Sequence, residues 1–298
     1  MTDSRGVSAA QHETRSFRRT PDRAGAALIP FARGSSGGTD DQLLQRLSET
    51  TIQLSQVVGH VVVVDDGSGL RFTAEDIPGC QQLIRLEHNI GKTGAIRAGL
   101  RELVGKAGIQ YVVQCDCDLD QRPSDACLLV DAYRRVDANR ASGPVLIVGD
   151  RYASYAAAFR SAAYRVELLL SCDLACRLAG LRMRDFVSGF RLFSIDFARR
   201  YLSMSQAEGF AVEIEQTICA YLCDATTGSV FLSWSRPRAT TTQTWKVVEA
   251  LEATSIHADA LRAKGWQGRL LQAWAARVAA KAKKAKSPSV GLGLTGGV

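Results

Sequence analysis

Short apolar runs alternate with amphipathic stretches through the first half of the chain. The runs at residues 27–31, 60–64, 83–86, 111–115 and 145–148 have the length of strands and are rich in Val, Ile and Leu. Near-continuous apolar runs are typical of strands that are covered on both faces. We therefore expect five strands in this half of the chain.

Helical spacing of apolar residues occurs between these runs, at residues 40–56 and 93–105. A third helix is expected after Ser124 and Asp125, whose side chains are suited to a helix start. Strands that alternate with helices indicate βαβ units. The pattern predicts an α/β, Rossmann-like fold with a mixed, mainly parallel sheet flanked by helices.

The second half is more helical, with expected helices at residues 156–179, 196–204 and 210–223 around a turn-rich segment at 185–193. Near the end, Leu270, Leu271, Trp274 and Val278 precede four lysines. This pattern predicts a basic amphipathic helix, either solvated or in peripheral contact with an anionic membrane. We expect a disordered polar tail at 1–25, one catalytic domain at 26–250, and a basic helical segment with a flexible end at 251–298.

Composition is that of an ordinary globular protein, with 46% hydrophobic and 22% charged residues in 298. No apolar run approaches the roughly 18 residues of a membrane-spanning helix, and the polar first 25 residues do not resemble a signal peptide. We therefore expect a cytoplasmic protein with reduced cysteines. The net charge of +7 favours an anionic ligand, and no motif indicates nucleic-acid binding.

Two carboxylates follow the second predicted strand, in the sequence Val-Val-Val-Val-Asp65-Asp66-Gly-Ser. Ligands of such sheets lie beyond the carboxyl ends of the strands. Asp65 and Asp66 are therefore candidates to accept hydrogen bonds from a base or a ribose. The alternative is an acidic turn that caps the next segment.

A second acidic strand end reads Gln-Cys-Asp116-Cys-Asp118-Leu-Asp120. In an extended chain Asp116 and Asp118 point to one side and the intervening cysteines to the other. Carboxylates this close repel each other unless a cation lies between them, and Mg2+ or Mn2+ would also bind diphosphate oxygens. This D-x-D pattern predicts a metal site, although an acidic loop is the simpler alternative.

The stretch Asn-Ile-Gly-Lys92-Thr-Gly superficially matches a phosphate-binding loop of kinases. That loop requires a glycine at the position of Leu86. The mismatch disfavours a phosphotransferase.

In this order the motifs resemble glycosyltransferase family 2, with its GT-A fold, and within it the dolichyl- or polyprenyl-phosphate mannose synthase branch. The resemblance runs from about residue 27 to 250. The matching blocks are Leu-Ile-Pro30, Val-Asp-Asp-Gly-Ser68, Asn-Ile-Gly-Lys92, Asp116-Cys-Asp-Leu, Gly-Asp-Arg151-Tyr, Ser-Gly-Phe-Arg191 and Gly-Phe leading to Glu215.

The resemblance implies a role for each matching residue. Nucleotide-sugar binding falls to Pro30, Asp65, Asp66, Lys92, Asp116, Arg151 and Arg160, and metal binding to Asp116, Asp118 and Asp120. The arginines would face phosphates of donor or acceptor. Catalytic roles are expected for Asp118, Asp185, Arg191 and Glu215, with Asp185 or Glu215 as the base if the acceptor is a hydroxyl.

Two departures from the family pattern affect the metal site and the donor site. Asp120 stands where this branch commonly has glutamine, and its added negative charge bears on metal preference. Ala32-Arg33-Gly34 replaces the usual tyrosine, asparagine and glutamate after the first strand, so the customary contacts to the base are absent. The donor therefore stays open among UDP-, GDP- and TDP-sugars.

The resemblance implies an inverting, metal-dependent transfer of a sugar to an acceptor, with polyprenyl phosphate expected. Two alternatives stay open. One is transfer to a soluble metabolite, and the other is a noncatalytic nucleotide-binding protein of the same fold.

Overall fold

The computed structural model describes residues 20–33, 38–119, 121–138, 143–151, 180–185, 188–209, 211–232 and 255–286. The expected helix at 156–179 lies outside these residues, as do Asp120 and Arg160.

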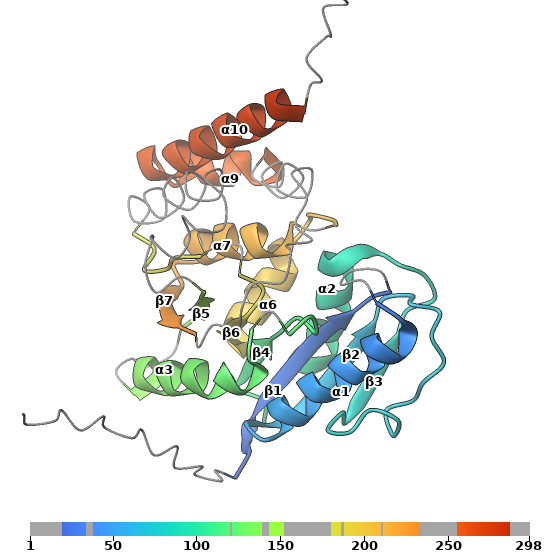
Figure 1. Cartoon of the computed structure of the whole chain (residues 1–298). Coiled ribbons are helices and arrows are strands. Elements are labelled where there is room, and N and C mark those ends of the chain that lie inside the picture. The colour runs from blue at the N-terminus through green and yellow to red at the C-terminus, as the bar shows by residue number, and fades with distance from the viewer. Residues whose placement is uncertain are drawn as a thin grey trace, which may run out of the picture.

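A seven-stranded sheet runs through the molecule in the order β3-β2-β1-β4-β6-β5-β7 (Figure 1). All of its neighbouring strands are parallel except at β6, which is antiparallel to both β4 and β5. The sheet is thus mixed and mainly parallel, as predicted. The strands are β1 (Asp22–Phe31), β2 (Val58–Asp65), β3 (Gln82–Arg85), β4 (Tyr111–Gln114), β5 (Val145–Asp150), β6 (Arg191–Ser194) and β7 (Thr226–Phe231).

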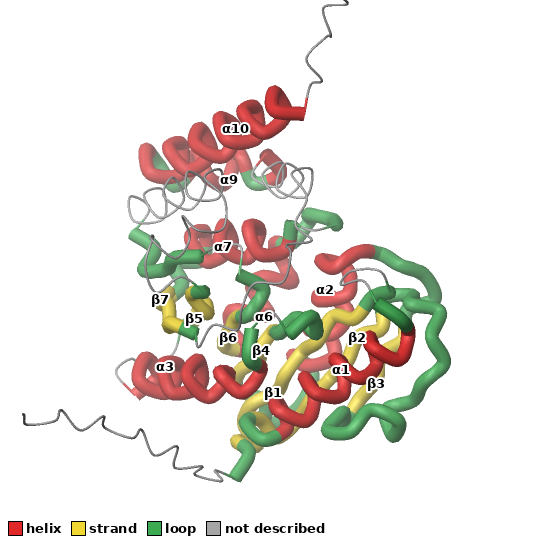
Figure 2. The backbone as a smooth tube through the Cα atoms, viewed as in Figure 1, coloured by secondary structure: helices red, strands yellow, loops and turns green. Residues whose placement is uncertain are grey.

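Helices cover both faces of this sheet (Figure 2). The first helix begins with a capping box in which Thr39 and Gln42 each bond to the other's backbone N–H. Within the described residues the helices are α1 (Asp40–Ser55), α2 (Gly91–Val104), the short η1 (Pro123–Asp125), α3 (Ala126–Ala138), α6 (Ile195–Met204), α7 (Val212–Leu222), α9 (Ala258–Ala263) and α10 (Trp266–Lys286).

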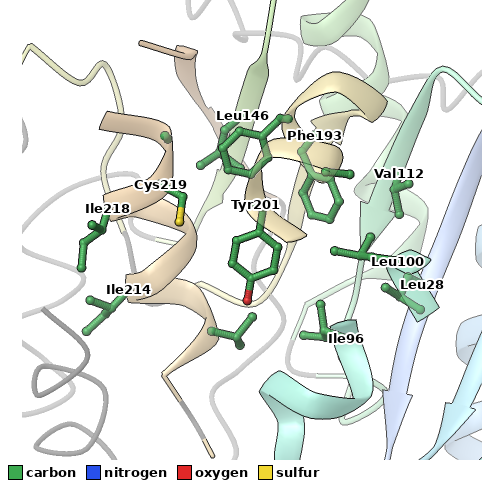
Figure 3. Close-up of a cluster of buried hydrophobic side chains, with 14 of the residues drawn as sticks. Leu28, Ile96, Leu100, Val112, Leu146, Phe193, Tyr201, Ile214, Ile218 and Cys219 are labelled. Atoms are coloured by element: carbon green, nitrogen blue, oxygen red, sulfur yellow. The ribbon is translucent and has the colours of Figure 1, made fainter. Parts of the chain in front are cut away.

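Alternating residues of the central strands divide the core into two layers. In β1, Leu28 packs with α2, α6 and α7, whereas Ile29 belongs to the layer with α1 and α3. Figure 3 shows the first layer, where Ile96 and Leu100 of α2 lie near Leu28, and Tyr201 of α6 lies between them and α7. Because side chains alternate along a strand, each central strand contributes to both layers.

Three local features differ from the sequence-based expectations. The strand β6 begins within the segment that was expected to be turn-rich, and β7 was not predicted. The segment expected to be a tail, 1–25, was assigned too far, because β1 begins at Asp22 and pairs there with Val58. The five predicted strands and the helices at 40–56, 93–105, 196–204 and 210–223 are otherwise present, with small shifts in their ends.

The basic C-terminal segment forms the predicted helix, α10, which lies with α9 beyond α7 (Figure 1). Leu261 and Leu271 are buried in the same core layer as α7. The segment therefore packs against the rest of the described fold and shares the core layer of α7. None of the described helices is both long and apolar enough to cross a membrane.

Candidate active site

The candidate site lies where the parallel strands β1, β2 and β4 end side by side. Pro30 pairs with Val64 at the end of β1, and Leu28 pairs with Gln114 at the end of β4. The acidic residues that follow β2 and β4 are thereby brought to the same edge of the sheet, which is where ligands bind in folds of this class. Pro30 itself is half-buried at this edge.

The first acidic pair holds the loops of this edge together. Asp65 is fully buried, forms an ion pair with Arg85 at 2.7 Å and accepts a hydrogen bond from the Ser68 N–H at 2.9 Å. Asp66 is also buried, and its Oδ1 accepts from the Ile90 N–H at 2.7 Å, just before α2. Both carboxylates thus act as the turn-stabilising groups of the simpler alternative. The expected nucleotide contacts of Asp65 and Asp66 stay predictions.

The second acidic strand end has the predicted alternation. Cys115 and Cys117 are buried, whereas Asp116 and Asp118 are only partly buried. Burial raises the pKa of Cys117 to about 12, so the inward thiol stays protonated at neutral pH. The carboxylates therefore supply the oxygen atoms that β4 presents at the edge of the sheet.

Lys92 joins this acidic strand end to α7. Its Nζ lies 2.8 Å from Asp116 Oδ2 and 2.6 Å from Glu213 Oε1. Burial alone would lower the pKa of Lys92, but Asp116 and Glu213 together raise that pKa above its ordinary value. Lys92 therefore carries a fixed positive charge between two carboxylates.

The turn before β6 closes against this ion-paired group. A Cβ on Gly189 would overlap the Asp116 carboxylate and lie 3.0 Å from Lys92 Nζ, so only glycine leaves room for both charges. The adjacent Arg191 is fully buried and donates from Nε to the Ser188 carbonyl at 2.7 Å and from Nη1 to the Glu213 carbonyl at 2.8 Å. Arg191 thus holds the turn before β6 and the first turn of α7 together, and its expected contact with a phosphate stays a prediction.

Arg151 and Asp185 are paired with each other. The Asp185 carboxylate is fully covered and accepts from Arg151 Nε and Nη2, both at 2.7 Å, and from the Arg151 backbone N–H at 3.1 Å. Both oxygens of Asp185 are engaged, so this carboxylate orients Arg151 in the structure. The side chain of Arg151 keeps 23% of its surface exposed and stays a candidate for phosphate binding.

Glu215 is turned toward the loop after α6 and away from Lys92. It is fully buried and accepts hydrogen bonds from the Ser205 hydroxyl at 2.5 Å, from the N–H groups of Gln206 and Ala207, and from His257 Nε2 at 3.1 Å. Burial would raise its pKa, but the donors, with His257 the strongest, lower the pKa to about 2. The ionised Glu215 therefore joins the loop after α6 and His257 to α7, and its expected role as a base stays a prediction.

A divalent cation fits the oxygen donors at the end of β4. Mg2+ is commonly held by one or two carboxylates together with substrate phosphates, and Asp116 and Asp118 supply two carboxylates. Within the described part of the chain, no group of three or more His, Cys, Asp or Glu side chains has the arrangement of a metal site. The prediction of Asp116, Asp118 and Asp120 as ligands stays a prediction.

Sequence reasoning missed Glu213, which reaches Lys92, and chose Glu215 two residues later. It also missed Gln114 and Gln216, which are fully buried beneath the site, with a hydrogen bond of 2.8 Å from Gln216 Nε2 to Gln114 Oε1. The spacing along α7 was the available signal. Residues two apart on a helix point in different directions, so Glu213 and Glu215 could not both face Lys92.

Comparison with protein-family models gives a match to the model described as glycosyl transferase family 2, over residues 43–202. This match covers more than half of the chain and includes β2, α2, β4 and β6. It therefore takes in Lys92, Asp116 and Gly189, although it ends before Glu213.

One curated relative is the dolichyl-phosphate beta-glucosyltransferase of Saccharomyces cerevisiae, which is 24% identical over 191 residues. The match covers 58% of this chain and 56% of the yeast protein, so the chain spans little more than half of that relative.

Similar solved structures include a CMP:2-keto-3-deoxy-manno-octonic acid synthetase complexed with CTP, with a TM-score of 0.46 and 16% identity over 78% of this chain and 99% of that chain. A 4-diphosphocytidyl-2C-methyl-D-erythritol synthase from Anaerococcus prevotii has a TM-score of 0.42 and 12% identity over 78% of this chain and 98% of that chain. At these scores the likeness supports no functional conclusion.

Proposed function

The chain belongs to glycosyl transferase family 2, and we propose that it transfers a sugar from a nucleotide-sugar donor to the phosphate of a polyprenyl phosphate, with inversion at the anomeric carbon. The observation that carries this proposal is the acidic end of β4, where Asp116 and Asp118 lie at the ligand edge of the sheet beside Lys92. The acceptor class is taken from the printed activity of the yeast relative.

The proposed reaction is a displacement in which an acceptor oxygen bonds to the anomeric carbon as the bond to the diphosphate oxygen breaks. The nucleoside diphosphate leaves with the electron pair of that bond. A phosphate acceptor is already anionic and requires no base, which agrees with Asp185 and Glu215 being covered. We infer a phosphate acceptor on this ground and from the printed activity of the yeast relative.

Within this proposal, Asp116 and Asp118 hold a divalent Mg2+ or Mn2+ ion, which would supply charge stabilisation for the leaving diphosphate. Lys92 adds a fixed positive charge at the same edge. Asp66 keeps the loop before α2 in place through its bond to the Ile90 N–H. Arg151, oriented by Asp185, binds a phosphate of donor or acceptor.

A lipid acceptor requires the protein to meet a membrane surface, and one segment has the charge for it. Residues 255–286 contain eight Lys and Arg and one Asp, whereas the rest of the chain contains 29 Lys and Arg and 29 Asp and Glu. The whole net charge of +7 therefore lies in this segment. We assign it to peripheral contact with anionic lipid, where Trp266, 60% exposed, begins α10.

The test is radiolabelled sugar transfer with UDP-, GDP- and TDP-sugars, Mg2+ or Mn2+, and polyprenyl phosphate in detergent. We expect label in the butanol-extractable lipid with one of these donors. Label found only in a water-soluble product would reject the lipid acceptor. Absence of transfer together with tight nucleotide binding would favour the noncatalytic alternative.

A further inference from the structure

The ion pairs of Lys92 join three elements that are distant in the sequence. Lys92 lies in the first turn of α2, Asp116 follows β4, and Glu213 lies in the first turn of α7. The three side chains are largely covered, with exposed fractions of 17%, 26% and 10%. Partly covered charges interact more strongly than exposed ones, because less solvent screens them.

The backbone around Glu213 is fixed from two directions. Arg191 donates to the Glu213 carbonyl at 2.8 Å, so the first turn of α7 is tied to β6. The loop before α7 packs on the start of α2, where the Thr93 N–H and hydroxyl both donate to the Gly209 carbonyl, at 3.0 and 2.9 Å. The distance between Glu213 and Lys92 is therefore set by the fold.

The charges of this group determine what the end of β4 attracts. Two carboxylates share one ammonium, so Lys92, Asp116 and Glu213 together carry one net negative charge. Without Glu213, Lys92 and Asp116 would form a neutral pair. Within this group, the ammonium would then interact with the Asp116 carboxylate alone. Asp116 would then be less available to any other cation.

We propose that Glu213 is a positioning residue of the site, which shares the Lys92 ammonium with Asp116 and thereby keeps the end of β4 attractive to a divalent cation. This role rests on the proposed function, because a cation is needed for sugar transfer. The effect of Glu213 on cation affinity can nevertheless be measured on the protein without any substrate. Glu213 acts through Lys92 and is assigned no contact with substrate.

The experiment is a titration of Mn2+ into the full-length protein without donor, followed by the electron paramagnetic resonance signal of the free ion. We expect Glu213→Gln to weaken Mn2+ binding by about five- to tenfold, because one negative charge near the ion is lost. Glu213→Asp, which retains the charge, should recover most of the affinity. Glu208→Gln is the matched control, since Glu208 is exposed and outside the ion-paired group.

Lys92→Met should change the Mn2+ affinity in the opposite direction, and it provides a second test if Glu213→Gln fails to fold. Removal of the ammonium should tighten Mn2+ binding by a similar factor. Equal affinity of wild type and Glu213→Gln, both folded by circular dichroism, would overturn the inference, as would the lack of measurable Mn2+ binding by wild type.

Sugar transfer is measured separately on the same proteins. A loss of Mn2+ affinity in Glu213→Gln, with no transfer by wild type from any donor, would support the role of Glu213 and reject the proposed reaction. Normal transfer by wild type with unchanged Mn2+ affinity in the variant would reject the role of Glu213 alone.

Discussion

Individual residues at the ligand edge divide into those that face the site and those that hold it. Asp116 and Asp118 keep exposed surface, whereas Asp65, Asp185, Arg191 and Glu215 are fully or almost fully buried and bonded within the protein. Residue type and spacing could single out most of these residues, because Asp65, Asp116 and Asp118 lie at strand ends and Asp185 and Arg191 flank a tight turn, whereas Glu215 lies within α7. Sequence could not predict which way each side chain faces, since that depends on partners such as Arg85 and His257 that are far away in the chain.

The clearest test of the acidic strand end is Asp118→Asn. We expect this variant to lose sugar transfer by at least about a hundredfold, because a carboxylate ligand of the cation is replaced by a neutral amide. Its melting temperature should stay close to that of wild type. The measurement is the initial rate with Mn2+, with Asp41→Asn on the exposed surface of α1 as the control.

Full activity of wild type in excess EDTA would contradict the metal requirement behind this prediction. Retained activity in Asp118→Asn would show that Asp118 is not a ligand of the cation, but it would not contradict the metal requirement.

Gly189 provides a steric test of the same site. In Gly189→Ala the added methyl group would overlap the Asp116 carboxylate and crowd Lys92. We expect a loss of transfer of about a hundredfold, because the carboxylate must move, and a decrease of about 1–3 kcal/mol in the free energy of unfolding from overpacking. Gly143→Ala is the control, since a Cβ added at Gly143 would have nothing within 4 Å. Equal activity of the two variants would contradict the close approach of Gly189 to the site.

At the scale of elements, the sequence predicts the first half of the sheet well and the second half poorly. Strands β1, β2 and β4 are buried and apolar, so their pattern is clear. By contrast, β6 has only four residues, and the first four residues of β7 are threonine, threonine, glycine and serine. Strands this short or this polar depend on pairing with their neighbours more than on their own sequence pattern. The strand β6, for example, is hydrogen-bonded to β4 on one side and to β5 on the other.

We expect the contact between α7 and the segment before α9 to weaken at low pH. The pKa of Glu215 falls from an ordinary value of 4.5 to about 2 in the folded protein. A lowered pKa means that the ionised carboxylate stabilises the fold at neutral pH, and that this contribution is lost as the pH falls from about 4.5 to about 2. At neutral pH it amounts to about 3 kcal/mol.

We therefore expect Glu215→Gln to lower the free energy of unfolding at pH 7 and to differ less from wild type at each step down toward pH 2. Urea unfolding of both proteins at a series of pH values measures this difference. A difference that does not change with pH would show that the ionised form of Glu215 is not what stabilises the contact.

For the whole molecule, the distribution of charge is more informative than the net charge. Residues 255–286 carry the full +7, and the remainder of the chain is neutral. Sequence alone predicts a basic helix, but it cannot predict that Leu261 and Leu271 pack this segment into the core layer of α7. Because Leu271 is buried, truncation within α10 would disturb the core as well as remove charge, so substitutions are the cleaner test.

Lys281, Lys283, Lys284 and Lys286 lie at the end of α10, in the last six of its residues. Changing all four to Gln should weaken binding to vesicles that contain phosphatidylserine by at least about tenfold, since each lysine near such a surface contributes about 1 kcal/mol. Changing the same four residues to Arg keeps the charge and should preserve binding. Sedimentation with vesicles at low and high salt measures the effect, and attraction of this kind should fall as salt rises.

Transfer to polyprenyl phosphate in anionic vesicles should decrease in the Gln variant along with vesicle binding, whereas transfer in neutral detergent should not. Equal vesicle binding by the Gln and Arg variants would reject lipid contact through this end of α10.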